Sequence, residues 1–206
     1  MIESSSPRLL TPALLAEFDR GLEEIGAPVT RFWRPGLNDH QMDALTAEIG
    51  LSLSAEARIW WGWHDGVDLD AAAPPVLLLG SGWEAFPLAV AVQDVLGKRQ
   101  YAQASPEFQN SAWPESWITL CGDASYPRIA CDCAVPYGAP STIHYFDPAG
   151  NMEPLRPKLG SIGELVHAWI EALDDGTWRI DPDTGHFALL APSELEAKGD
   201  DIGDLL

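Results

Sequence analysis

The chain of 206 residues is long enough for one domain with a substantial hydrophobic core. It carries 31 acidic and 12 basic side chains, and this net charge of −19 argues against nucleic acids and anionic membranes as partners. The charge favours a basic partner, although it is also typical of surfaces that serve solubility alone. No apolar run approaches the roughly 20 residues of a membrane span.

The first ten residues show no basic stretch followed by an apolar one, so no secretory signal is expected. Three cysteines, an odd and low number, are typical of a reducing compartment. We therefore expect a cytoplasmic protein without disulfide bonds. The sequence does not indicate an oligomeric state.

The first half of the chain shows the periodicity of amphipathic helices. Helices are predicted over residues 11–26, 38–50, 51–66 and 87–100. The predicted N-terminal caps are Thr11 followed by Pro12, Asn38 with Gln41, and Ser54. Glycines at 26, 50 and 66 are predicted to end the first three helices. A turn-rich connector is expected at 27–36, and a loop with a short apolar strand at 73–80.

The second half begins with short segments rich in Ile, Thr and aromatic residues, separated by Gly, Pro and Asp. This pattern predicts sequential antiparallel strands at 116–122, 127–133 and 141–147. A closing helix is predicted at 161–176, with Ser161 and Glu164 as a capping box. The order of elements favours an α+β fold with an antiparallel or mixed sheet flanked by helices. No glycine-rich phosphate loop follows a strand, and an acidic tail ends the chain.

The stretch WWGWHDG, residues 60–66, combines three tryptophans with His64 and Asp65. A carboxylate can orient an imidazole for acid–base chemistry. Adjacent residues at a helix end point in different directions, however, and this favours a packed helix end. We therefore predict that Trp60 and Trp63 are in the core, that Asp65 and Gly66 form a turn, and that His64 is exposed.

The motif Cys131-Asp132-Cys133 lies on a predicted strand, where both thiols share one face. They could begin a zinc site that Cys121 or His144 completes, or they could be small core residues. Structural zinc sites usually place C-x₂₋₄-C pairs in turns, so no metal site is predicted here.

The nine tryptophans divide into two groups, apart from Trp33. The first group occupies periodic core positions: Trp60, Trp63, Trp117 and Trp169. The second group lies near turns and is expected to be partly exposed, at the edge of the core or as binding anchors: Trp61, Trp83, Trp113 and Trp178.

Catalytic motifs such as G-x-S-x-G and H-E-x-x-H are absent from the sequence, and no cysteine stands in a recognisable nucleophile motif. Pairs of carboxylates for glycoside hydrolysis arise by chance among 31 acidic residues, so they do not distinguish an enzyme. We therefore expect a protein without enzymatic activity and without a cofactor.

Three blocks of the sequence resemble the SUKH superfamily, which includes fungal regulators of cell-wall synthesis and many bacterial immunity proteins. The first block is LSLSAEARIWWGWHDG, with Leu53, Glu56, Ile59, Trp60, Trp63, Asp65 and Gly66 in the family's places. The second runs from Trp113 to Phe146 and matches at Trp117, Ile118, Leu120, Gly122, Asp123, Ile129, Asp132, Pro136, Gly138, Ile143 and Tyr145. The third is the closing helix, with Ser161, Ile162, Leu165, Trp169 and Leu173. Ser54 replaces the usual proline, and the segment 71–112 is longer than the family leads us to expect.

The resemblance implies a single domain over residues 1–206, with a family-like core at about 40–178. An N-terminal helical extension at 1–36 and an acidic tail at about 192–206 would flank this core. It also implies a sheet of about five or six strands, no catalytic residues and a protein partner. Bacterial members of this kind neutralise toxins, and an acidic inhibitor suits a basic, nuclease-like toxin. The alternative is a regulatory scaffold, as in the fungal relatives.

The predicted partner-binding residues lie in and after the acidic stretch HDGVDLD. They are Asp65, Asp68 and Asp70, with Trp83 or Trp113 beside them. In the simpler interpretation these carboxylates are ordinary solvated loop residues.

Overall fold

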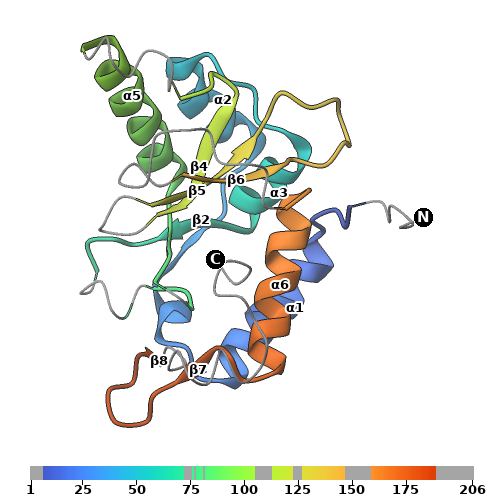
Figure 1. The fold of residues 1–206 in the computed structure, drawn as a ribbon, viewed down its shortest axis with the longest axis vertical. Coiled ribbons are helices and arrows are strands. Elements are labelled where there is room, and N and C mark those ends of the chain that lie inside the picture. Colours follow the sequence, from blue (N-terminus) through green and yellow to red (C-terminus); the bar gives the residue numbers. More distant parts are fainter. Residues whose placement is uncertain are drawn as a thin grey trace.

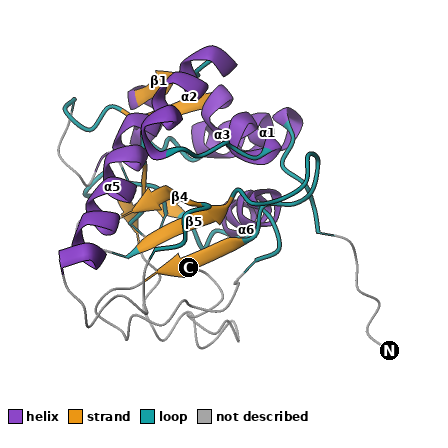
Figure 2. Ribbon diagram, turned by 90° about the horizontal axis from the view of Figure 1, so that it is seen from above, coloured by secondary structure: helices purple, strands orange, loops and turns teal. Residues whose placement is uncertain are grey.

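The computed structural model describes residues 7–71, 76, 78–80, 82–104, 113–122, 127–146 and 159–188. These residues form a mixed α+β fold in which helices flank a central antiparallel sheet, as expected (Figures 1 and 2). The helical elements are α1 (Pro12–Glu24), η1 (Pro28–Phe32), α2 (Asp39–Thr46), η2 (Ala47–Ile49), α3 (Ala55–Trp63), α5 (Leu88–Ala104) and α6 (Ile162–Asp174). In the described ranges, no helix has the length and apolar character needed to cross a membrane.

The main sheet has four antiparallel strands in the order β3-β4-β5-β6. Its strands are β3 (Glu84–Ala85), β4 (Trp117–Gly122), β5 (Arg128–Asp132) and β6 (Ile143–Phe146). Two small antiparallel pairs join β1 (Trp33–Pro35) to β2 (His64–Val67) and β7 (Arg179–Ile180) to β8 (Phe187–Ala188). The three predicted consecutive strands are thus confirmed as β4, β5 and β6. Strand β3 adds to the main sheet beside β4, whereas β1 with β2 and β7 with β8 form separate pairs, so the main sheet has four strands within the described residues.

The predicted helix caps are confirmed, with one change. The Thr11 side chain accepts a hydrogen bond from the N–H of Leu14, and Asn38 and Gln41 form a complete capping box. At α6 the Ser161 hydroxyl accepts from the N–H of Glu164, as predicted. The Glu164 carboxylate, however, accepts from the N–H of Gly160 at 2.7 Å, one residue before the cap.

The end of the third helix differs from the prediction. Helix α3 ends at Trp63, and residues 64–67 leave it as strand β2, which pairs with β1. Gly66 has a φ of +64° inside this strand, and a Cβ there would lie 2.3 Å from the backbone nitrogen of Pro87. Gly66 is therefore required for close backbone packing rather than as a helix stop.

The apolar strand predicted at 73–80 is also not formed by the described part of that segment. Val76 is helical, and Leu79 makes a single bridge to Trp83. A short apolar run does not by itself distinguish a strand from other buried structure. The acidic tail from about 192 lies outside the described residues.

Helices α1 and α6 run parallel and side by side (Figure 1). The segment before α1 meets the start of α6, because a Cβ on Gly163 would lie 2.3 Å from the carbonyl oxygen of Arg8. Towards the other end, Gly21 of α1 faces Leu173 of α6, where an added Cβ would lie 2.9 Å from Leu173 Cδ1. Glycines at both positions let the helices approach closely, and their C-terminal ends lie at the same end of the pair.

The buried side chain of Glu56, on α3, joins three distant segments. Only 2% of the residue is exposed. Its Oε1 accepts hydrogen bonds from the N–H groups of Leu10 at 2.7 Å and Gly163 at 3.1 Å, and its Oε2 accepts from Ser141 at 2.5 Å. The hydroxyls of Ser54 and Ser141 lie 2.6 Å apart beside it. We call these contacts of Glu56 the carboxylate clamp.

Replacing Glu56 by Gln tests the carboxylate clamp. The amide has one acceptor oxygen and would direct an NH₂ group at a backbone N–H, so we expect a loss of about 3 kcal/mol in the free energy of unfolding. Urea denaturation measures this loss. Glu48→Gln is the control, because Glu48 is exposed and its replacement should change stability by less than about 0.5 kcal/mol. Equal stability of the two variants would contradict the clamp's importance.

Candidate protein-binding face

Asp65, the first predicted binding residue, is buried with 4% of its surface exposed. Its Oδ1 accepts a hydrogen bond at 2.8 Å from the N–H of Leu88, the first residue of α5, and its Oδ2 pairs with Arg34 Nε at 3.1 Å. The expectation that Asp65 lies in an exposed turn is wrong, because the strand β2 turns it inward. Its carboxylate satisfies a helix N–H that would otherwise lack a partner.

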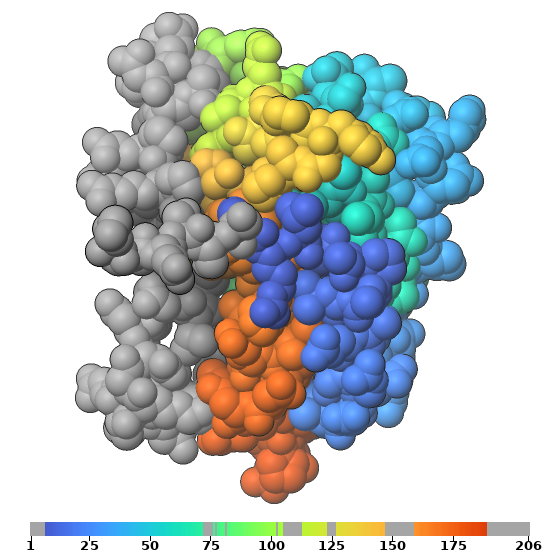
Figure 3. Space-filling model, turned by 90° about the vertical axis from the view of Figure 1, so that its right-hand side faces the viewer, coloured from blue at the N-terminus to red at the C-terminus, as the bar shows by residue number. Residues whose placement is uncertain are grey.

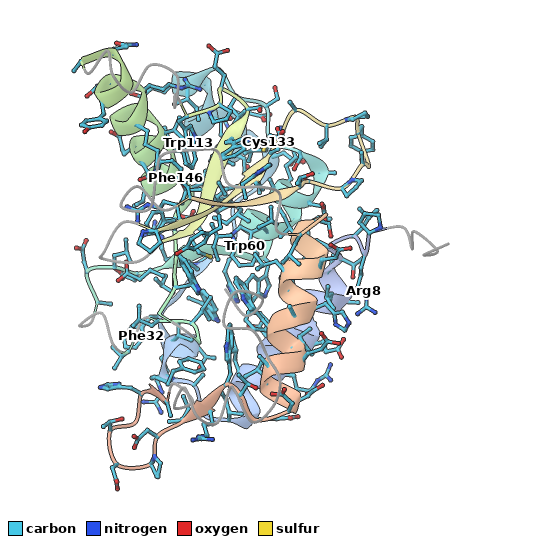
Figure 4. The ribbon with its side chains drawn as sticks, in the orientation of Figure 1. Arg8, Phe32, Trp60, Trp113, Cys133 and Phe146 are labelled. Atoms are coloured by element: carbon cyan, nitrogen blue, oxygen red, sulfur yellow. The ribbon has the colours of Figure 1, made fainter. Side chains whose placement is uncertain are left out.

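Trp83 and Trp113 are buried as well, so the expectation that they are partly exposed is wrong. The Trp113 indole donates to the carbonyl of Trp117 at 3.0 Å and its ring meets Phe146 edge-on, as the labelled side chains of Figure 4 illustrate. Trp83 meets Tyr145 edge-on at 5.9 Å. The same correction applies to Trp61 and Trp178, which are also buried. Long-range packing covers all four, and proximity to a turn in the sequence does not reveal such packing.

Asp68 and Asp70 are the predicted binding residues that reach solvent. Asp68 Oδ1 accepts from the N–H of Asp70 at 3.2 Å, and the Asp68 N–H donates to Phe32 in η1. The three aspartates therefore do not form one surface, because Asp65 points inward. A role of Asp68 and Asp70 in partner binding stays a prediction.

The stretch WWGWHDG divides between the core and a half-buried cluster. Trp60 and Trp61 are buried, whereas Trp63 and His64 are partly exposed. His64 does not pair with Asp65. Its Nε2 lies 3.6 Å from the carboxylate of Asp19 on α1, which also accepts a hydrogen bond from the Trp63 indole at 2.7 Å. Trp33 stacks on the imidazole with a centroid separation of 4.9 Å.

A second charged group is partly buried beside β4 and β5. Asp94 on α5 pairs with Lys98, accepts from the Thr119 hydroxyl at 2.6 Å, and lies 3.2 Å from Arg128 Nε. Burial alone would raise the pKa of Asp94, but Lys98, Thr119 and Arg128 outweigh it and the pKa is lowered. Burial lowers the pKa of Lys98 to about 8, against the opposing effect of Asp94. The Lys98 ammonium also lies 4.3 Å from the centroid of Trp113. These contacts describe an ion cluster that joins α5 to the sheet.

The zinc site considered for the Cys-x-Cys motif is not formed in the part of the chain that the structure describes. No three His, Cys, Asp or Glu side chains gather there as a metal site. His144 pairs with Ala130 across β5 and β6, whereas Cys131 pairs with Ile143. Directly paired residues share a face of the sheet, so His144 points to the face opposite Cys131.

The exposed side of α1 and α6 carries a concentration of negative charge. Its six exposed carboxylates belong to Glu17, Glu23, Glu24, Glu171, Asp174 and Asp175, and its exposed base is Arg20. Figure 3 looks onto this side, where the dark blue N-terminal segment and the orange α6 lie next to each other. We call this surface the acidic face.

The negative charge of these carboxylates adds to the partial negative charge of the helix C-terminal ends, which makes their repulsion stronger than the number of carboxylates alone indicates. Both helices present their C-terminal ends together, and Glu23, Glu24, Asp174 and Asp175 lie there. The C-terminal end of a helix carries a partial negative charge that favours cations. Neither helix has a basic residue in its last turn. The sequence contains these carboxylates, but the parallel packing that brings them together was not predictable from it.

The loop 134–140 borders the same side above α6 (Figure 3). It connects β5 to β6, and Tyr137 at its tip is 98% exposed. The loop closes on itself through a hydrogen bond from the N–H of Ala139 to the carbonyl of Pro136 at 2.9 Å. Its C-terminal end leads to Ser141, one of the three groups held by the carboxylate clamp. An exposed aromatic ring on an anchored loop has the character of an interface anchor.

Asp65→Ala tests whether Asp65 is structural. Loss of its bonds to Leu88 and Arg34 should lower the free energy of unfolding by about 1–2 kcal/mol, measured by urea denaturation. Asp70→Ala removes an exposed carboxylate five residues away and should cost less than about 0.5 kcal/mol. A larger loss for Asp70 than for Asp65 would refute this assignment.

Asp94→Asn tests the ion cluster through its pH dependence. The substitution leaves Lys98 and Arg128 without this carboxylate, and we expect it to cost about 3 kcal/mol at pH 7. Because the pKa of Asp94 is lowered in the folded state, its contribution is complete above the unfolded pKa of about 4 and disappears as pH falls through the lower folded value. Urea midpoints of the wild type and the variant, measured from pH 7 to pH 2, should therefore converge in acid. A constant difference would contradict the assignment.

Comparisons with models of known protein families and with curated proteins find no match. The resemblance to the SUKH superfamily therefore stays a prediction from the sequence motifs. Any function assigned to the acidic face depends on its own charge and geometry.

Proposed function

We propose that this protein binds a basic protein partner through the acidic face and neutralises it, as an immunity protein does for a nuclease-like toxin. The observation that carries the proposal is the gathering of six exposed carboxylates on two parallel helices, with four of them at the negative C-terminal ends. The motif resemblance points in the same direction, since bacterial members of that superfamily include immunity proteins.

The charge distribution explains why the partner should be basic. Carboxylates beside one another, and beside helix C-termini, repel each other and reduce the stability of the free protein. Lysine and arginine side chains of a partner would remove this repulsion on binding. The long-range field would also steer such a partner to the face and speed association at low ionic strength.

A nuclease-like toxin has the required chemistry. A protein that binds nucleic acid contacts the phosphates mainly with lysine and arginine side chains. An acidic face docked on those side chains would occupy the phosphate sites and exclude the nucleic acid. Tyr137, exposed on the bordering loop, would supply the apolar anchor that charge pairs in water do not provide.

Two triple variants with the same change in net charge test the location of the interface. Glu17→Gln, Glu23→Gln and Glu24→Gln neutralise half of the acidic face. The matched control neutralises three exposed carboxylates elsewhere, in Glu48→Gln, Glu115→Gln and Asp183→Asn. Tagged wild type and both triples are used to capture proteins from a lysate of the source cells at low and at high salt.

We expect one strongly basic protein to be retained by the wild type and the control triple, and to be released by salt. The acidic-face triple should retain at least about tenfold less of it. The purified captured protein should degrade nucleic acid, and one equivalent of wild type should stop this degradation. Equal capture by both triples would exclude the acidic face, and several unrelated neutral partners would support the regulatory scaffold instead.

A further inference from the structure

The Cys-x-Cys motif has a geometry that the proposed function does not use. Cys131 lies in β5 between Ile118 of β4 and Ile143 of β6, and Cys133 lies one residue beyond the end of β5. Their sulfur atoms are 4.0 Å apart. Cys131 is fully buried, whereas Cys133, labelled in Figure 4, is 8% exposed and leads into the exposed loop 134–140. Both cysteines are buried, but Cys133 keeps a little exposed surface and Cys131 has none.

The N-cap of helix α3 also influences Cys133. Ser54, which caps that helix, is among the groups that lower the pKa of the Cys133 thiol. Donors at a helix N-terminus favour a thiolate over a thiol. The hydrogen bond with Cys131 and the donors of Ser54 lower the pKa of Cys133, although burial opposes them. The same thiol pair contact, together with burial, raises the pKa of Cys131.

The third cysteine has none of these features and provides an internal comparison. Cys121 lies in β4, is fully buried, and has its pKa raised by burial. It therefore resembles an inert core cysteine.

We propose that Cys133 and Cys131 form a reactive dithiol, in which Cys133 is the attacking thiol and Cys131 the resolving thiol, and that its co-reactant is a low-molecular-weight disulfide. The geometry carries this assignment: the two sulfurs are 4.0 Å apart, and Cys133 is the more exposed of the two residues and leads into the exposed loop 134–140. Two residues on a strand span about 6.6 Å between Cα atoms, at the upper end of the range that a disulfide bridges. A small movement of the chain after β5 would close the bond.

The reaction proceeds by two exchanges. The Cys133 thiolate attacks one sulfur of the small disulfide, forms a mixed disulfide, and releases one small thiolate. The Cys131 thiol then loses its proton to that released thiolate, attacks the Cys133 sulfur, and releases the second small thiolate. The protein loses two protons and two electrons, and the small disulfide takes them up to become two thiols.

Peptide mass analysis tests the proposal on the full-length folded protein with oxidised glutathione as the probe. The reaction is quenched with acid, and the remaining thiols are alkylated after unfolding. Trypsin then separates the cysteines, because cleavage after Arg99, Arg128 and Lys158 places Cys121 in residues 100–128 and the dithiol in residues 129–158. We expect peptide 129–158 to lose two hydrogens and to remain unalkylated, at a rate at least about tenfold above any modification of Cys121. Dithiothreitol should reverse the change.

Single substitutions assign the two roles. Cys131→Ser should stop the reaction at a stable glutathione adduct on Cys133, and Cys133→Ser should abolish reaction at Cys131. Cys121→Ser should leave the reaction unchanged. If a substitution prevents folding, the mass of peptide 129–158 from the wild-type protein still shows whether the dithiol is oxidised faster than Cys121 is modified. A stable glutathione adduct in the wild type, or reaction of 129–158 no faster than of Cys121, would overturn the proposal.

Discussion

The fold depends on one buried side chain, Glu56, which joins three distant segments of the chain. Glu56 accepts hydrogen bonds from N–H groups that lie 46, 85 and 107 residues away in the chain. A buried carboxylate is costly unless hydrogen bonds replace its hydration, and three backbone donors do so here. The carboxylate also provides hydrogen-bond acceptors for the three N–H groups. The N–H of Gly163 lies in the first turn of α6 and has no acceptor within its own helix. The N–H groups of Leu10 and Ser141 donate to the same carboxylate. The carboxylate clamp therefore satisfies one backbone N–H group from each of three segments and holds these segments together.

The clamp also determines what the acidic face can present. Its three partners are the segment before α1, the start of α6 and the end of the loop that carries Tyr137, so the clamp holds each part of the proposed interface at one end. The negative charges are divided accordingly. Glu56, Asp65 and Asp94 are paired in the interior or near it, whereas the exposed carboxylates belong to α1 and α6, which pack against each other. An interface whose backbone is fixed loses little conformational freedom on binding, which favours affinity.

Local signals in the sequence were sufficient for the caps of α1 and α2, for strands β4 to β6 and for the existence of helix α6, because each depends on neighbouring residues. They failed where a distant segment decides the structure. Strand β2 forms because β1 pairs with it, although residues 64–67 follow directly from a helix. Asp65 and the turn-proximal tryptophans are buried for the same kind of reason. Glu56 was singled out through the motif resemblance, but its three partners lie in segments that no periodicity connects. The acidic face forms only because α1 and α6 pack in parallel, and 137 residues, 25–161, separate these two helices in the sequence. No local signal could predict that packing.

The dithiol and the clamp meet at Ser54, yet they are separable. The Ser54 hydroxyl accepts from the N–H of Ala57 and lies 2.6 Å from the Ser141 hydroxyl, and Ser54 lowers the pKa of Cys133. Closing a bond between Cys131 and Cys133 would leave the helix cap and the three bonds of Glu56 in place, because none of them involves sulfur. A change in thiol chemistry would therefore affect the start of loop 134–140 at Cys133, while its end at Ser141 stays fixed. Any influence of the dithiol on partner binding would have to pass through this loop and Tyr137, and the charge of α1 and α6 would be unchanged.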